Sequence, residues 1–147
     1  ILKSKIYSMS SIGFEINNGV AIIKLNRPEV FNSFNKEMAK SMQARLDECE
    51  ENAEVRAIYI IGEGKAFCAG QDLQEVTDPN GPELTSIVAE HYNPIIERIR
   101  NIEKPIIGAV NGVAAGAGAN TPCRHKSSSQ FATKGTEGST RVSESQT

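Results

Sequence analysis

The chain has 147 residues and a formal net charge of -2. This length predicts a single domain, and the near-neutral charge gives no reason to expect nucleic acid or an anionic membrane as a partner. No apolar run reaches transmembrane length. The three cysteines are far apart and lack the spacing of metal ligands, so we expect no metal site and a cytoplasmic location.

Residues 1–10 precede the first predicted strand. They lack the long apolar region and the cleavage pattern of a signal peptide. The chain begins with isoleucine, and Met9 fits a translation start. We therefore interpret residues 1–10 as an upstream or disordered segment.

The first half of the chain predicts two strands and a helix. Residues 13–16 and 20–25 are predicted strands, and Asn18-Gly19 between them favours a type I′ hairpin turn with positive φ at both positions. Asn35 can cap a helix over residues 36–51. Its predicted buried face consists of Met38, Met42, Leu46 and Cys49.

The second half alternates strands and helices. Residues 55–62 form a mostly apolar run, which predicts a strand covered on both faces. A helix over residues 84–102 follows, and we expect Pro94 to kink or split it. Residues 106–110 predict a further strand. This order of elements indicates an α/β fold with long crossovers.

Two segments carry the residues that could do chemistry. They are residues 65–73 (KAFCAGQDL) and residues 108–120 (GAVNGVAAGAGAN). Their small residues permit close backbone approach, and each segment is typical of a tight turn that opens a helix with free N–H groups. The N–H of Gln71, with that of Ala117 or Gly116, would give two donors on one oxygen. Such an oxyanion hole stabilises a thioester that becomes an enolate.

The same residues also have purely structural interpretations. Both segments could be ordinary strand-to-helix turns, with Asp72 as a helix cap rather than a base. Cys68 fits a small buried side chain as well as a reactive thiol, and His91 fits a packed or half-exposed histidine. The glycines after residue 110 do not form a dinucleotide or phosphate-binding motif.

Residues 121–147 are dominated by serine, threonine and other polar residues. Such a segment buries too little apolar surface to offset the entropy of ordering it. We interpret residues 121–147 as a polar, low-complexity, disordered tail.

Four motifs in order resemble those of the crotonase (enoyl-CoA hydratase/isomerase) superfamily. They are LNRPEVFNSF, KAFCAGQDL, KPIIGAVNG and AAGAGAN, which begin at residues 25, 65, 104 and 114. The resemblance covers about residues 11–120 and is strongest to the isomerase branch that acts on the ring epoxide of phenylacetyl-CoA. It implies a crotonase-like ββα spiral core, of which residues 11–120 are the N-terminal part, so the core is incomplete.

The resemblance also implies a site. Gln71 and Ala117 would supply the two backbone N–H groups, beside Gly116 and Asn120. An acyl-CoA would be the substrate, with no other cofactor. Contacts to coenzyme A are implied for Arg27, Val30, Phe31, Ala69, Asp72 and Leu73. Arg27 or Lys65 could meet CoA phosphates, and the alternative for either is a solvated surface cation.

Asn120 stands where the hydratases of the superfamily have a glutamate acid/base. An amide does not exchange protons at neutral pH, so an isomerase with one later carboxylate fits better than a hydratase. Family members continue with further strands, that carboxylate and a helical region used to form trimers or hexamers, and residues 121–147 match none of this. Two alternatives stay open: a catalytically inactive, truncated CoA-binding fragment, and an interaction module unrelated to coenzyme A.

Overall fold

The structure is a computed structural model that describes residues 10–116. The predictions for the tail, for Ala117 and for Asn120 lie outside the described residues. The elements, in chain order, are β1 (Ile12–Asn17), β2 (Val20–Leu25), η1 (Pro28–Val30), α1 (Lys36–Glu51), β3 (Ala57–Gly62), β4 (Ala66–Cys68), α2 (Leu73–Thr77), α3 (Leu84–Ile87), η2 (Val88–Tyr92), α4 (Asn93–Asn101), β5 (Ile106–Ala109) and β6 (Val113–Ala114). Helices and strands mix as the α/β prediction requires.

A four-stranded sheet in the order β1-β2-β3-β5 forms the main layer. The β1–β2 pair is antiparallel, and the β2–β3 and β3–β5 pairs are parallel. Asn18 and Gly19 have φ angles of 49° and 82°, which confirms the predicted hairpin turn. Both parallel connections pass through helices, as parallel strands require.

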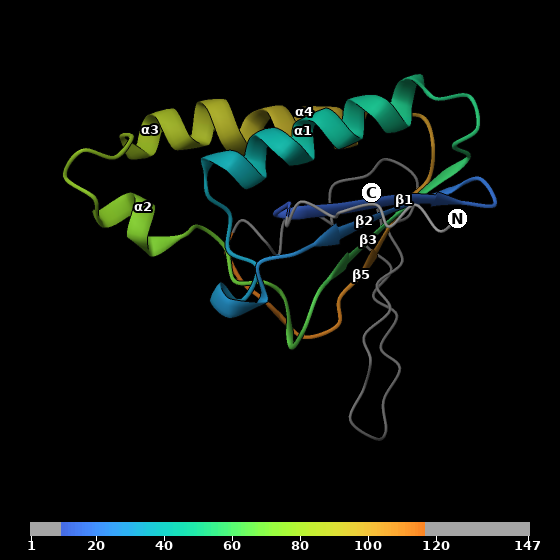
Figure 1. Ribbon diagram of the computed structural model, residues 1–147. Helices are drawn as coiled ribbons and strands as arrows, with labels where there is room; N and C mark the ends of the chain where they lie inside the picture. Colours follow the sequence, from blue (N-terminus) through green and yellow to red (C-terminus); the bar gives the residue numbers. More distant parts are fainter. Residues whose placement is uncertain (1–9, 117–147) are drawn as a thin grey trace, which may run out of the picture.

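Helices α1 and α4 lie side by side over one face of this sheet (Figure 1). The predicted face of α1 is buried, and the Asn35 side chain accepts the Met38 N–H at 2.9 Å, so the predicted cap is confirmed. Burial alternates along β3, with Ile58 and Ile60 buried and their neighbours half-buried. The prediction that both faces of this strand are covered is wrong for the described part of the chain, because the helices pack on one face.

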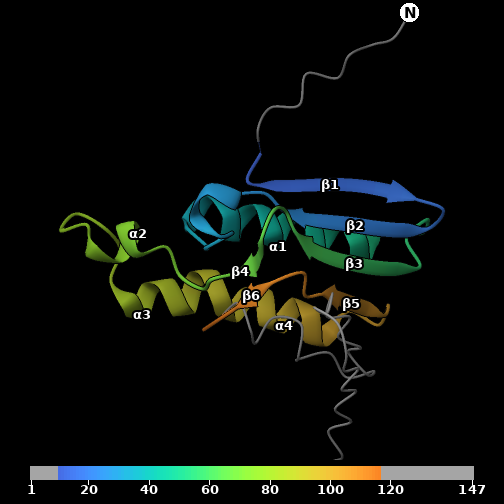
Figure 2. The same ribbon diagram turned by 90° about the horizontal axis from the view of Figure 1, so that it is seen from below.

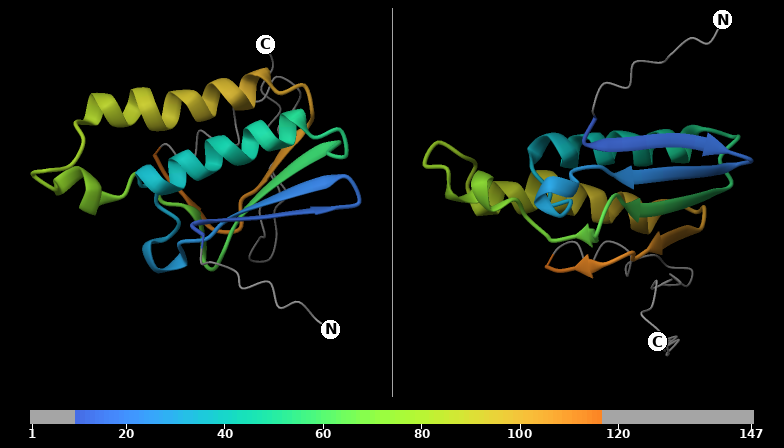
Figure 3. Two further views of the ribbon diagram at one scale, coloured as in Figure 1. Left: turned by 45° about the horizontal axis from the view of Figure 1, so that its top comes forward. Right: turned by 60° about the horizontal axis from the view of Figure 1, so that its bottom comes forward.

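The chain remains helical from Leu84 to Asn101 through Pro94 (Figure 3). Pro94 does not split this helix, but the hydrogen-bond pattern changes before it, where η2 is a π-helical turn with Asn93 N–H donating to Val88 O. Proline has no N–H for the Glu90 carbonyl. The Gln43 side chain replaces that donor, with Nε2 2.9 Å from Glu90 O.

A second, two-stranded sheet pairs β4 with β6 in parallel, beyond the end of the main sheet (Figure 2). Ala66 pairs with Val113 and Cys68 with Ala114. We expected residues 108–120 to lead from a strand directly into a helix. Instead the chain forms this short strand first, and it brings the two glycine-containing segments into contact.

Candidate functional site

The turn that follows β4 is fixed on one edge by residues 31–34. Ala69 N–H donates to Phe31 O at 2.9 Å, and Phe34 N–H donates to Gly70 O at 2.7 Å. Asp72 N–H donates back to Phe34 O at 2.9 Å. The other edge of β4 meets β6, where Ala115 N–H donates to Cys68 O at 3.0 Å. The turn is therefore held between two neighbouring segments.

The direction of the Gln71 amide follows from these bonds. The Gly70–Gln71 peptide is trans, so its C=O and N–H point in opposite directions. The C=O is bonded to Phe34, and the Gln71 N–H consequently points away from Phe34. No acceptor for this N–H exists among residues 10–116. Within this part of the chain the Gln71 N–H is a backbone donor without an acceptor, and its role in an oxyanion hole stays a prediction.

Gly70 and Gly116 bring the two segments close together. Their φ angles, +105° and +55°, lie in the region that favours glycine. A Cβ on Gly70 would lie 3.2 Å from Ala115 O, and one on Gly116 would lie 3.9 Å from the Gly70 Cα. The described chain ends at Gly116, one residue before Ala117. The two segments predicted to share a site are therefore neighbours in space.

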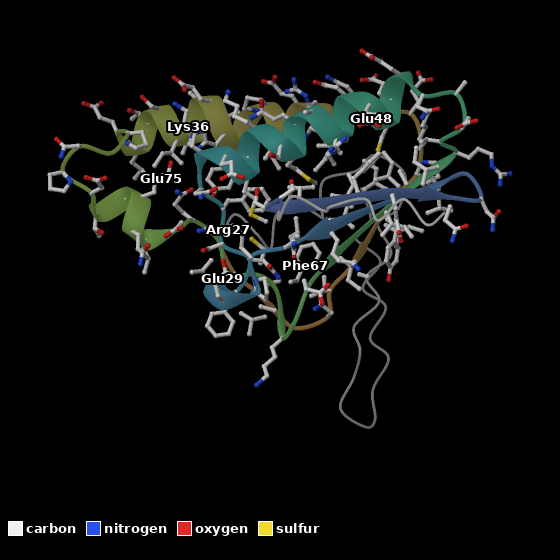
Figure 4. The ribbon with its side chains drawn as sticks, in the orientation of Figure 1. Arg27, Glu29, Lys36, Glu48, Phe67 and Glu75 are labelled. Carbon is white, nitrogen blue, oxygen red and sulfur yellow. The ribbon has the colours of Figure 1, made fainter. Side chains whose placement is uncertain are left out.

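Arg27, which Figure 4 labels, forms an ion pair with Asp72 beside this turn. Arg27 Nη2 lies 2.8 Å from Asp72 Oδ2, and Arg27 Nη1 donates to Ser33 O at 2.6 Å. The Arg27 side chain is 16% exposed, so its interpretation as a solvated surface cation is wrong. Asp72 Oδ1 accepts the Gln74 N–H at 2.9 Å, which confirms the helix cap. A contact of either residue with coenzyme A remains a prediction.

Asn32 is a buried polar residue near this turn to which the sequence analysis gave no role. It is fully buried, with a φ of 56°, and its Nδ2 donates at 2.9 Å to both Glu63 O and Ala66 O. Its Oδ1 accepts the Arg27 N–H at 2.8 Å. Asparagine tolerates the left-handed region better than most residues. This tolerance is the one local signal that could have indicated its left-handed conformation.

The remaining predicted CoA contacts lie at the surface around the turn. Phe31 is 54% exposed, Leu73 is 74% exposed, and Ala69 is exposed. Val30 is half-buried. The structure brings these residues near the turn and leaves apolar area accessible there. Lys65 is exposed as well.

Several polar side chains gather behind Gln71. The Tyr92 hydroxyl donates to Gln71 Oε1 at 2.7 Å, and burial raises the pKa of Tyr92. His91 is buried, which confirms the packed-histidine interpretation, and its Nδ1 lies 3.9 Å from Glu75 Oε1. Burial lowers the pKa of His91, so its ring is neutral at pH 7. Glu75 Oε2 accepts the Lys36 N–H at the start of α1 (2.8 Å; Figure 4).

Cys68 acts as a small buried side chain. Its thiol is buried, Gly70 N–H points at its Sγ at 3.4 Å, and burial raises its pKa to about 11. A thiol with a raised pKa carries little thiolate at neutral pH. Its interpretation as a buried structural residue is therefore favoured over a reactive one.

Within residues 10–116 no cluster of three potential metal ligands occurs. In the same part of the chain, no helix combines the length and apolar character needed to cross a bilayer.

A mixed sheet with helices on one face, and with two glycine-containing turns meeting beyond its end, fits a crotonase-type fold. The chain belongs to the enoyl-CoA hydratase/isomerase family, whose model matches residues 15–122. It is 45% identical over 114 residues to the 1,2-epoxyphenylacetyl-CoA isomerase of Escherichia coli, covering 76% of this chain and 44% of that protein.

Other relatives are also described as enoyl-CoA hydratases or isomerases. A probable enoyl-CoA hydratase of Rhodobacter capsulatus is 42% identical over 113 residues, covering 77% of this chain and 43% of the relative. An enoyl-CoA hydratase/isomerase of Xanthobacter autotrophicus matches with a TM-score of 0.72 at 27% identity, covering 86% of this chain and 49% of that one. The chain thus spans less than half the length of these curated relatives.

Proposed function

We propose that the protein is an acyl-CoA isomerase in which the Gln71 N–H holds the thioester oxygen of the substrate. The observation that carries this proposal is the direction of the Gly70–Gln71 peptide. Its carbonyl is bonded to Phe34 N–H at 2.7 Å, so its N–H faces away and is free of acceptors among residues 10–116. Family membership supports a CoA thioester as the ligand.

The chemistry requires a second donor on the same oxygen. The contact between Gly70 and Gly116 supports the Ala117 N–H for this role, because Ala117 is the next residue along the chain. Two donors stabilise the oxyanion that forms when an α-proton leaves the thioester. The proton then returns to a different carbon, and the double bond moves. We assign the transfer of this proton to no residue among 10–116.

The amide side chain of Asn120 favours isomerisation over hydration. An amide does not serve as the acid or base that water addition would need. The likeness to an isomerase in Escherichia coli, at 45% identity, supports the same choice. The exposed side chains of Phe31 and Leu73, with the Ala69 backbone, are the surface that we propose contacts coenzyme A.

The test removes the Gln71 N–H and keeps its side chain. Incorporating the α-hydroxy acid analogue of glutamine at position 71 replaces N–H by an ester oxygen. The preference for butyryl-CoA is the ratio of the dissociation constants of S-butyl-CoA, which lacks the carbonyl oxygen, and butyryl-CoA. We expect this preference to fall about tenfold in the Gln71 ester. Where the chain turns over an enoyl-CoA, the rate should fall by about 10²–10³.

The matched control is the same ester at Leu84. This residue begins α3, and its N–H also has no acceptor among the described residues. We expect the Leu84 ester to keep the full preference for butyryl-CoA. An unchanged preference in the Gln71 ester, or no preference in the unmodified chain, would contradict the proposal.

A further inference from the structure

Tyr92 contacts Gln71 from the helical layer. Its hydroxyl donates to Gln71 Oε1 at 2.7 Å. Gln71 Nε2 is buried and has no hydrogen-bond partner in the described part of the chain. Within that part, the Tyr92 hydroxyl is therefore the one polar anchor of the Gln71 side chain.

Phe34 joins the same arrangement. Its N–H donates to Gly70 O at 2.7 Å, and its carbonyl accepts the Asp72 N–H at 2.9 Å. The Phe34 backbone therefore bonds the peptide on each side of Gln71. Its ring lies against that of Tyr92, with centroids 6.2 Å apart and planes tilted by 52°. The three residues Phe34, Gln71 and Tyr92 thus support one another in a closed set of contacts.

The turn needs such an anchor because of Gly70. A glycine at φ +105° has more conformational freedom than any other residue, and it directly precedes the peptide that presents the proposed donor. A donor to a developing oxyanion acts only when it lies about 2.7–3.1 Å from that oxygen. The side-chain bond from Tyr92 restricts the residue on the other side of this flexible point.

The π-helical turn η2 ends at Tyr92. A π-turn inserts an extra residue into a helix and changes the direction of the side chains that follow, and such turns are frequent at functional sites. Asn93 N–H bonds Val88 O across this turn, and Gln43 supplies the donor that Pro94 lacks. The irregular helix therefore has its own supports at the point where Tyr92 reaches Gln71.

We propose that Tyr92 is a positioning residue for the acyl-CoA site, because its hydroxyl fixes the Gln71 turn and thereby the direction of the Gln71 N–H. This inference rests on the proposed function of Gln71. It adds a residue of the helical layer to a site formed otherwise by two turns.

The experiment measures binding of butyryl-CoA and S-butyl-CoA to the full chain and to Tyr92→Phe. We expect the preference for butyryl-CoA to fall about tenfold in Tyr92→Phe while the affinity for S-butyl-CoA stays unchanged. Gln71→Ala should lose as much, and the double variant should lose no more than either single one. Tyr59→Phe is the matched control, since no partner of the half-buried Tyr59 hydroxyl is found among residues 10–116.

A second measurement needs no ligand. In the free chain, the backbone ¹⁵N–¹H resonance of Gln71 should shift in Tyr92→Phe and stay in place in Tyr59→Phe. A wild-type preference retained by Tyr92→Phe, or an unmoved Gln71 resonance, would overturn the inference and leave the proposed function standing. A wild-type chain without preference or binding would instead contradict the proposed function and this inference with it.

Discussion

Arg27 and Asp72 are 45 positions apart in the sequence, yet Arg27 Nη2 lies 2.8 Å from Asp72 Oδ2. The two side chains are only 16% and 9% exposed. Their ion pair joins the end of β2 to the cap of α2, immediately after Gln71. It connects the first motif of the chain to the turn that presents the proposed donor.

Arg27→Met should lower the free energy of unfolding by about 3 kcal/mol, because it leaves the Asp72 carboxylate buried without its partner. Urea unfolding monitored by circular dichroism measures the change. Lys24→Met is the control, since Lys24 and Glu63 lie 3.7 Å apart with side chains 47% and 49% exposed. An exposed pair contributes less than about 1 kcal/mol, so equal losses in both variants would refute this account.

Lys104 should stabilise the C-terminal end of α1. Its Nζ donates to Cys49 O at 2.6 Å, Glu50 O at 3.0 Å and Asn52 O at 2.9 Å. The Cys49 and Glu50 carbonyls belong to the last turn of α1, where carbonyls lack helical N–H donors, and Asn52 O accepts the Val55 N–H as well. A cation at this end of the helix also interacts favourably with the helix dipole. We expect Lys104→Met to cost about 1–3 kcal/mol in urea unfolding. Lys65 is exposed, so Lys65→Met should hardly change the free energy of unfolding. An unchanged free energy of unfolding in Lys104→Met would contradict the role of Lys104.

His91 should make stability depend on pH. Burial lowers its pKa below the ordinary 6.5, so the folded chain binds fewer protons than the unfolded chain as the pH falls from 6.5 towards the folded pKa. Stability should therefore be highest above pH 6.5 and fall as the solution is acidified through this window. Urea midpoints between pH 8 and pH 5.5 measure the effect. His91→Phe should remove most of this slope, and a variant with the wild-type slope would show that another group is responsible.

Gly112 should tolerate no side chain. A Cβ at this position would overlap Lys65 O, whereas one at Gly13 would lie 3.3 Å from the Lys24 Cβ. Gly112→Ala should therefore push β6 from β4 and cost about 1–3 kcal/mol. Gly13→Ala should be milder, and thermal unfolding of the two variants provides the comparison. A Gly112→Ala chain as stable as the wild type would contradict the close packing at this point.

Local rules predicted the elements that local chemistry determines. The Asn18-Gly19 turn requires two positive φ angles, and the structure has them. The helix over 36–51 follows from its apolar spacing and the Asn35 cap. Asp72 as a cap depends only on a short polar side chain before α2. Such features need no knowledge of distant residues.

The parts that sequence reasoning missed depend on long-range contacts. Strands β4 and β6 have three and two residues, too few to show an alternating pattern. The bond from Tyr92 to Gln71 spans 21 positions, and no local pattern pairs a tyrosine in a helix with a glutamine in a turn. Neither interpretation of Arg27, a CoA contact or a solvated cation, included its ion pair with Asp72, because that partner is distant in the chain. These pairings exist only once the layers have packed.

The central claim is that the Gln71 N–H binds the carbonyl oxygen of an acyl-CoA. The infrared band of that carbonyl, isolated by ¹³C labelling of bound butyryl-CoA, tests it most directly. We expect the band to move to lower wavenumber on binding and to move back when the Gln71 N–H is replaced by an ester oxygen. A band unchanged on binding, or equally shifted in the Gln71 ester, would contradict the claim.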